Sequence, residues 1–186
     1  PYKKRKVRIL NGGHTSTVLA ARLYGLSTVK ECLDDPLINK YLNKAIFEEI
    51  IPTLGHEEED IPFGKAVLER FSNPFVKHQL LSIALNSVSK FKARVLPTIL
   101  EYREKNGSLP KCLTFSLAAL IAFYRTDETN DGEEIMAFMK TASVEDILKK
   151  EQYWGEDLSF MKDEVEKYYE SIQKNGVGKT IETLLG

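Results

Sequence analysis

The sequence is poor in the features that mark secreted, membrane-spanning and nucleic-acid-binding proteins. Its 186 residues include only two cysteines, too few for a disulfide framework, which predicts a reducing, cytoplasmic setting. The longest apolar run, residues 113–124, falls short of the roughly 18 residues that cross a bilayer. With 26 basic and 27 acidic residues, the net charge of −1 argues against a dedicated nucleic-acid binder. After these exclusions we expect a globular protein, and its 42% hydrophobic residues are enough to form a sizeable core.

Strand signals are also scarce, because no alternating run is flanked by a hairpin turn. Apolar residues instead recur every three or four positions, which is the spacing of a helix face. We expect helices over residues 7–21, 36–52, 75–96, 113–124, 144–152 and 158–172. Residues 113–124 are apolar nearly all round and are predicted to be the most buried helix, whereas residues 56–60 are predicted to be a polar loop. No repeat or linker interrupts the pattern, so residues 1–186 are interpreted as one all-α domain.

The near-neutral charge conceals an uneven distribution. Residues 65–111 carry nine basic residues against three acidic ones, whereas residues 127–170 carry fourteen acidic residues against five basic ones. A basic surface formed by the first segment would attract an anion. Such a charge gradient also occurs on surfaces that only keep a protein soluble. Charge by itself therefore does not decide between an anion-binding surface and an ordinary solvated one.

One constellation of polar residues lies near the start of the chain. On an α-helix at about 100° per residue, Asn11 lies about 140° and His14 about 80° from Lys6, so all three fall within one arc. Between them stand Gly12 and Gly13, each of which costs a helix roughly 1 kcal/mol relative to Ala, a pattern that favours close approach by a helix or a ligand. The three side chains suit proton transfer, alkoxide stabilisation and hydroxyl binding. The alternative is a helix N-terminus with a core histidine.

The segment Lys-Val-Arg-Ile-Leu-Asn-Gly-Gly-His-Thr, residues 6–15, resembles the catalytic signature of the mannitol dehydrogenase family of polyol-specific long-chain dehydrogenases. Lys6, Asn11 and His14 match that signature residue by residue. Three further segments resemble the C-terminal helical domain of the family: residues 28–32, 49–52 and 70–74. A fourth segment, residues 78–94, is similar to the tagaturonate reductase (altronate oxidoreductase) branch of the family in particular. The resemblance covers most of the chain. It implies an all-α, multi-helix substrate domain of the type shared with 6-phosphogluconate dehydrogenase, without a Rossmann domain.

The resemblance implies a role for each matched residue. Lys6 would be the general acid/base at the ketone oxygen, Asn11 would polarise that carbonyl, and His14 would bind a neighbouring hydroxyl. Lys90 matches a substrate-binding lysine of the family. The sequence departs from the mannitol-type pattern at Ser82, where those members carry an arginine, and at Asn86, where they tend to carry an acid.

A sugar-acid substrate would need cations at that end of the pocket. Four basic residues are candidates: His78, Lys90, Lys92 and Arg94. For Lys92 and Arg94, ordinary surface charge explains the residues equally well.

A dinucleotide-binding fingerprint is absent, since no Gly-x-Gly-x-x-Gly occurs between a strand and a helix. The resemblance therefore implies that NAD is bound mainly by an N-terminal domain of the same parent chain. The sequence is accordingly interpreted as a fragment of a larger enzyme, inactive as a dehydrogenase by itself, with a sugar-acid substrate and with no metal, membrane or nucleic-acid partner.

Three functions remain open at this stage. The first is the substrate domain of an NAD-dependent tagaturonate reductase of hexuronate catabolism. The second keeps the chemistry but changes the substrate to fructuronate or to a polyol such as mannitol. The third is a non-catalytic helical interaction domain.

Overall fold

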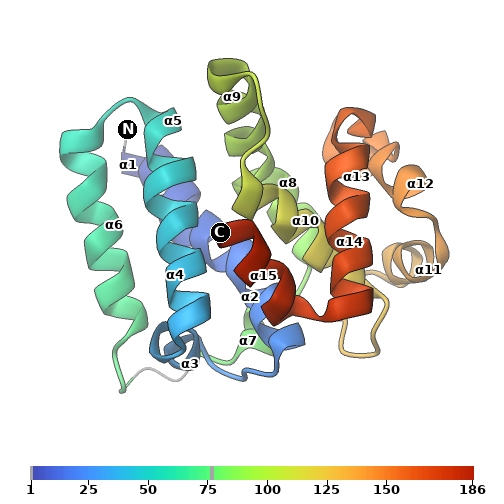
Figure 1. The fold of residues 1–186 in the computed structure, drawn as a ribbon, viewed down its shortest axis with the longest axis horizontal. Helices are drawn as coiled ribbons and strands as arrows, with labels where there is room; N and C mark the ends of the chain where they lie inside the picture. The colour runs from blue at the N-terminus through green and yellow to red at the C-terminus, as the bar shows by residue number, and fades with distance from the viewer. Residues whose placement is uncertain (1, 76–77) are drawn as a thin grey trace.

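The computed structural model describes residues 2–75 and 78–186 as a set of helices joined by short turns (Figure 1). Within those ranges there is no strand, and extended backbone pairs only in an isolated bridge between Thr28 and Gln79. None of the described helices is long and apolar enough to cross a membrane. The elements in chain order are α1 (Tyr2–Arg5), η1 (Lys6–Asn11), α2 (Gly12–Tyr24), α3 (Val29–Asp34), α4 (Pro36–Lys44), η2 (Ala45–Ile50), α5 (Ile51–Leu54), α6 (Glu57–Phe71), α7 (Leu80–Ile83), α8 (Ser87–Arg94), α9 (Leu96–Asn106), α10 (Lys111–Tyr124), α11 (Glu133–Thr141), α12 (Val144–Leu148), α13 (Glu151–Trp154), η3 (Ser159–Met161), α14 (Lys162–Asn175) and α15 (Val177–Leu185).

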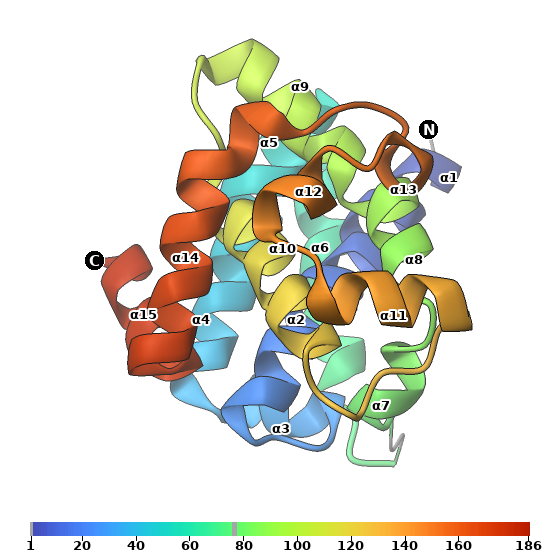
Figure 2. The ribbon, with the colours of Figure 1, turned by 90° about the vertical axis from the view of Figure 1, so that its right-hand side faces the viewer.

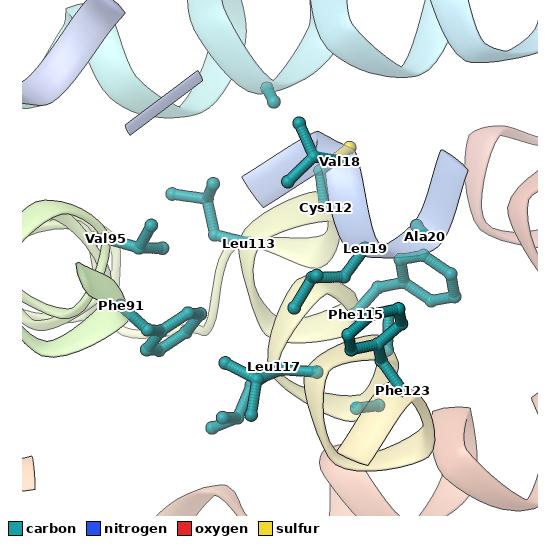
Figure 3. Close-up of a cluster of buried hydrophobic side chains, with 14 of the residues drawn as sticks. Val18, Leu19, Ala20, Phe91, Val95, Cys112, Leu113, Phe115, Leu117 and Phe123 are labelled. Atoms are coloured by element: carbon teal, nitrogen blue, oxygen red, sulfur yellow. The ribbon is translucent and has the colours of Figure 1, made fainter. Parts of the chain in front are cut away.

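The core is built around α10, which is buried from Cys112 to Tyr124. This helix packs against α2 and α14, so that early and late parts of the chain meet on it (Figure 2). Apolar side chains of α2, α8 and α10 gather in one cluster (Figure 3). An apolar surface on every side of a helix requires such all-round burial. The predictions of an all-α fold and of a deeply buried helix over residues 113–124 are confirmed.

A buried carboxylate holds the start of α10. Glu49, on η2, accepts hydrogen bonds from the backbone N–H groups of Cys112 and Leu113 at 2.9 and 3.0 Å. These N–H groups lie in the first turn, where no helical partner exists, and the helix dipole favours a negative charge there. Burial nevertheless raises the pKa of Glu49 above its usual value. The contact joins the N-terminal third of the chain to the central helix.

Three predictions about local structure are wrong, and one of them is the single helix expected over residues 144–152, which is instead the two short helices α12 and α13. Residues 57–60 form the first turn of α6 rather than a loop, because acidic side chains stabilise a helix N-terminus and Asp60 is buried in an ion pair with Arg5. The helix expected over residues 75–96 is instead a loop followed by the separate helices α7 and α8. The break falls at Asn86, which has the left-handed φ of 54° and whose N–H donates to Asn130 O at 3.0 Å. Residues 76 and 77 of that expected helix lie outside the described residues.

Helix α8 is anchored at its N-terminus by a side chain of α10. The Tyr124 hydroxyl accepts from the backbone N–H of Val88 at 3.3 Å and donates to Asp131 at 2.6 Å. Burial raises the pKa of Tyr124 well above its usual value, so the hydroxyl keeps its proton and can donate. This anchoring fixes the helix that carries Lys90 and Arg94.

Candidate active site

The segment that carries the predicted catalytic residues is a π-helix, not the α-helix assumed from the sequence. Its six residues, Lys6–Asn11, are followed by Gly12, whose N–H bonds to Val7 O, five residues earlier. With hydrogen bonds spanning five residues, positions i and i+5 lie close to one line along the helix. Asn11 therefore lies one turn beyond Lys6, on the same face, and His14 follows three residues later on α2. This winding aligns the three residues better than the 140° offset of an α-helix.

Two arginines fix the π-helix from opposite sides. Arg5 donates to Asp60 at 2.7 Å and to Glu59 at 2.6 Å, both on α6. Arg8 donates to Thr98 at 3.2 Å and pairs with Glu101, both on α9. This role was not predicted from the sequence, although the spacing of the two arginines around Lys6 was a signal for it.

Lys6 itself is exposed and forms no ion pair or hydrogen bond within the described residues. The neighbouring Arg5 and Arg8 form ion pairs with carboxylates of α6 and α9, whereas no carboxylate of the described residues pairs with the ammonium group of Lys6. A lysine held on a fixed backbone but left without a carboxylate is available to a reactant.

The paired glycines have different surroundings. A Cβ atom added to Gly12 would lie 2.9 Å from the backbone oxygen of Arg94, a distance that real Cβ contacts do not reach. A Cβ on Gly13 would meet Ile46 Cδ1 at 3.5 Å, an ordinary van der Waals contact. The close approach predicted from the sequence is thus made at Gly12, and it brings the end of α8 against the start of α2.

His14 lies near basic side chains from other segments of the chain. Its ring stacks on Phe71, with centroids 4.1 Å apart and 16° between the planes, and the ring of His78 is 6.4 Å away. Burial, reinforced by the charges of His78, Arg94 and Lys90, lowers the pKa of His14 to about 4. The imidazole is therefore neutral near pH 7 and can orient a hydroxyl group.

The two cations on α8 share one face of that helix. Lys90 donates to Ile83 O at 2.8 Å, and Arg94, four residues later, approaches Thr15 Oγ1 at 3.5 Å. Burial lowers the pKa of both groups, and the charge of Arg94 also lowers that of Lys90. Two partly buried cations without a carboxylate partner in the described residues favour an anionic ligand.

Lys92 lies away from this group. It stands two residues from both Lys90 and Arg94, which on a helix is the opposite side. Its Cε lies 3.2 Å from the position of a Cβ on Gly155, at the end of α13. Lys92 therefore lies outside the group in which His14, His78, Lys90 and Arg94 come together. Thr15 and Phe71 join them and were not foreseen.

The helical fold and this cluster define an all-α domain in which a lysine–asparagine–histidine face meets a pair of cations from a second helix. The chain belongs to the mannitol dehydrogenase C-terminal domain family, which matches residues 1–174. The family resemblance drawn from the sequence is thereby confirmed.

Several curated relatives carry the name altronate oxidoreductase. The protein of Pectobacterium carotovorum subsp. carotovorum is 53% identical over 139 residues, covering 74% of this chain and 28% of the relative. That of Yersinia pestis bv. Antiqua is 42% identical over 193 residues, covering 93% of this chain and 40% of the relative. That of Bacillus subtilis is 39% identical over 196 residues, covering 98% of this chain and 41% of the relative. The chain thus spans about two fifths or less of the length of these relatives.

Two solved structures share the fold. Pseudomonas fluorescens mannitol 2-dehydrogenase, in a ternary complex with NAD and D-mannitol, aligns with a TM-score of 0.89 at 25% identity, over 100% of this chain and 41% of that one. A D-sorbitol dehydrogenase in substrate-free form aligns with a TM-score of 0.83 at 22% identity, over 97% of this chain and 40% of that one.

Proposed function

We propose that this chain is the substrate-binding and catalytic domain of an NAD-dependent tagaturonate reductase of the cytoplasm, which interconverts D-tagaturonate and D-altronate in hexuronate catabolism. The names of the curated relatives support the reaction. The observation that carries the substrate class is the surroundings of His14, where the cationic groups Arg94 and Lys90 both contribute to lowering its pKa. A carboxylated sugar fits such a site better than a neutral one.

The proposed roles are those that the family resemblance implies, and the alignment of the helix face supports them. Lys6 gives its proton to the ketone oxygen during reduction and takes one back during oxidation, since an unpaired ammonium can exchange a proton with an adjacent oxygen. Asn11, on the same line of the π-helix, donates an amide hydrogen bond to the developing alkoxide. The neutral His14 orients a neighbouring hydroxyl. Lys90 and Arg94 bind the carboxylate at the far end of the sugar, next to His78.

The nicotinamide cofactor belongs to another part of the parent protein in this proposal. The described residues form no strand, and a dinucleotide site needs a strand, a Gly-rich turn and a helix. The greater length of the relatives leaves room for such a domain. When bound, the cofactor supplies the hydride, while this chain orients the substrate and moves the proton. The 186-residue chain alone is expected not to oxidise NADH with tagaturonate.

A substrate panel with the full-length parent tests the proposal. We expect kcat/KM to be highest for tagaturonate, lower for fructuronate and lowest for fructose, which lacks the carboxylate. A charged hydrogen bond contributes about 1.5–3 kcal/mol, so Arg94→Ala should cost roughly 10- to 100-fold in kcat/KM on tagaturonate. The same variant should change kcat/KM on fructose less than about threefold.

Lys92→Ala is the matched control, because Lys92 lies on the same helix but away from the cluster. Equal losses with charged and neutral substrates in Arg94→Ala would contradict the carboxylate assignment. The mannitol 2-dehydrogenase structure with D-mannitol supports a polyol as the second candidate. A preference for mannitol or fructose over the sugar acids would favour it.

A further inference from the structure

A small cavity lies beside His14, between helices α2, α3, α4 and α6. Its walls include His14 and Thr17 of α2, Val29 and Cys32 of α3, Leu42 of α4 and Phe71 of α6. The space open to the centre of a water molecule is about 10 Å³. That volume is at the lower limit for a single water and is too small for any larger ligand.

Two of the residues that line this cavity each have a polar side-chain atom without a hydrogen-bond partner in the described residues. His14 Nε2 and Thr17 Oγ1 are both buried and unpaired within the described residues. Thr17 as a whole is only 3% exposed, so bulk water does not serve its hydroxyl. The two residues stand three positions apart on α2 and therefore project from neighbouring positions on one helix face. Buried polar atoms are paired in folded proteins with very few exceptions, and an internal water is a common partner.

We propose that the cavity holds one water molecule hydrogen-bonded to both His14 Nε2 and Thr17 Oγ1, which makes Thr17 a positioning residue for His14. Water and hydroxyl groups each donate and accept, so this bridge satisfies Nε2 in either neutral tautomer of the ring. The other walls are mainly apolar, which confines the water to these two partners and the weakly polar thiol of Cys32.

The bridge has a function that stacking on Phe71 cannot provide. Stacking at 16° fixes the plane of the imidazole but allows a half-turn of the ring about the Cβ–Cγ bond, which returns the ring to the same plane. The half-turn would exchange the positions of Nε2 and a ring carbon. A water bound to Nε2 favours the orientation in which Nε2 faces the cavity, and it thereby fixes the position of Nδ1 as well. Thr17 thus acts through the water and the ring rather than on the substrate.

The first test is direct observation. A high-resolution crystal structure of the full-length protein should show density for one water within hydrogen-bond distance of both atoms. Thr17→Val keeps nearly the same volume but removes the hydroxyl, so its structure should lack the water. An empty cavity in the unmodified protein would overturn the proposal.

A second measurement follows the ring itself in protein labelled with ¹⁵N-histidine. Thr17→Val should shift the His14 Nε2 resonance, and Thr17→Ser should restore it. Thr114→Val is the matched control, because Thr114 is also buried with an unpaired hydroxyl but lies on α10, outside the cavity. An unchanged His14 spectrum in Thr17→Val would refute the positioning role.

The kinetic consequence rests on the proposed function. In the full-length enzyme, Thr17→Val should lower kcat/KM for tagaturonate about tenfold, with recovery in Thr17→Ser and no comparable loss in Thr114→Val. If the protein lacks tagaturonate activity while the water and the spectral shift are present, the proposed function fails and the bridge stands. If the enzyme is active and Thr17→Val matches the unmodified protein in rate, Thr17 has no positioning role.

Discussion

The adjacent glycines Gly12 and Gly13 offer a paired test of how α2 meets α8. Alanine at either position should gain about 1 kcal/mol of helix propensity, so this contribution cancels in a comparison of the two variants. Only the Gly12→Ala methyl group meets backbone, 2.9 Å from the oxygen of Arg94, whereas the Gly13→Ala methyl group finds ordinary contact at 3.5 Å with Ile46. Overpacking against a fixed neighbour costs about 1–3 kcal/mol. Gly12→Ala should therefore be less stable than Gly13→Ala by that amount.

Thermal unfolding followed by far-ultraviolet circular dichroism measures the difference. For a chain of this size each kcal/mol changes Tm by about 2–4 °C, so Gly13→Ala should melt roughly 2–12 °C above Gly12→Ala. Because the displaced carbonyl belongs to Arg94, Gly12→Ala should also lower kcat/KM for tagaturonate in the full-length enzyme. Equal Tm values for the two variants would refute the close approach of α8 to the start of α2.

Two further predictions concern the surroundings of the site. The pKa of His14 is about 4 in the folded protein against 6.5 in the unfolded chain, so the unfolded chain binds the extra proton first as pH falls. Between pH 6.5 and 4 this linkage should lower the free energy of unfolding by about 3 kcal/mol. Urea titrations of His14→Gln should not show this loss, and parallel pH profiles of stability for the two proteins would contradict the prediction. Asp60→Asn breaks a largely buried ion pair with Arg5 and should cost about 3 kcal/mol, whereas Glu59→Gln, at a carboxylate 68% exposed, should cost less than about 1 kcal/mol. Similar urea midpoints for these last two variants would show that Asp60 does not hold the π-helix.

Periodicity was sufficient to predict the helical fold and its most buried helix. Residues 113–124 are apolar all round, and only a central position can bury such a surface. Periodicity could not predict the break at Asn86, because the hydrogen bond to Asn130 that accompanies its left-handed conformation comes from a distant part of the chain. The helical state of residues 57–60 was readable in principle, since a run of acidic residues is typical of a first turn.

The candidate site was predicted in its residue types but not in its geometry. The separation of four residues between Lys90 and Arg94 already placed them on one face, and the same reasoning excludes Lys92. The π-helical winding that aligns Lys6 with Asn11 has no periodic signature in six residues, and arginines paired with α6 and α9 flank it. Helix type at this point depends on tertiary contacts, which a single sequence does not contain.

The catalytic role of Lys6 is tested most directly by the rate of the full-length enzyme after removal of the Lys6 ammonium group. General acid/base catalysis contributes about 10²- to 10⁴-fold, so Lys6→Ala should lower kcat for tagaturonate reduction by at least about 100-fold. Lys3→Ala is the matched control, since Lys3 is an exposed lysine on α1, and it should retain nearly full activity. A Lys6→Ala enzyme within about threefold of the unmodified kcat would contradict the catalytic role and favour a non-catalytic helical domain.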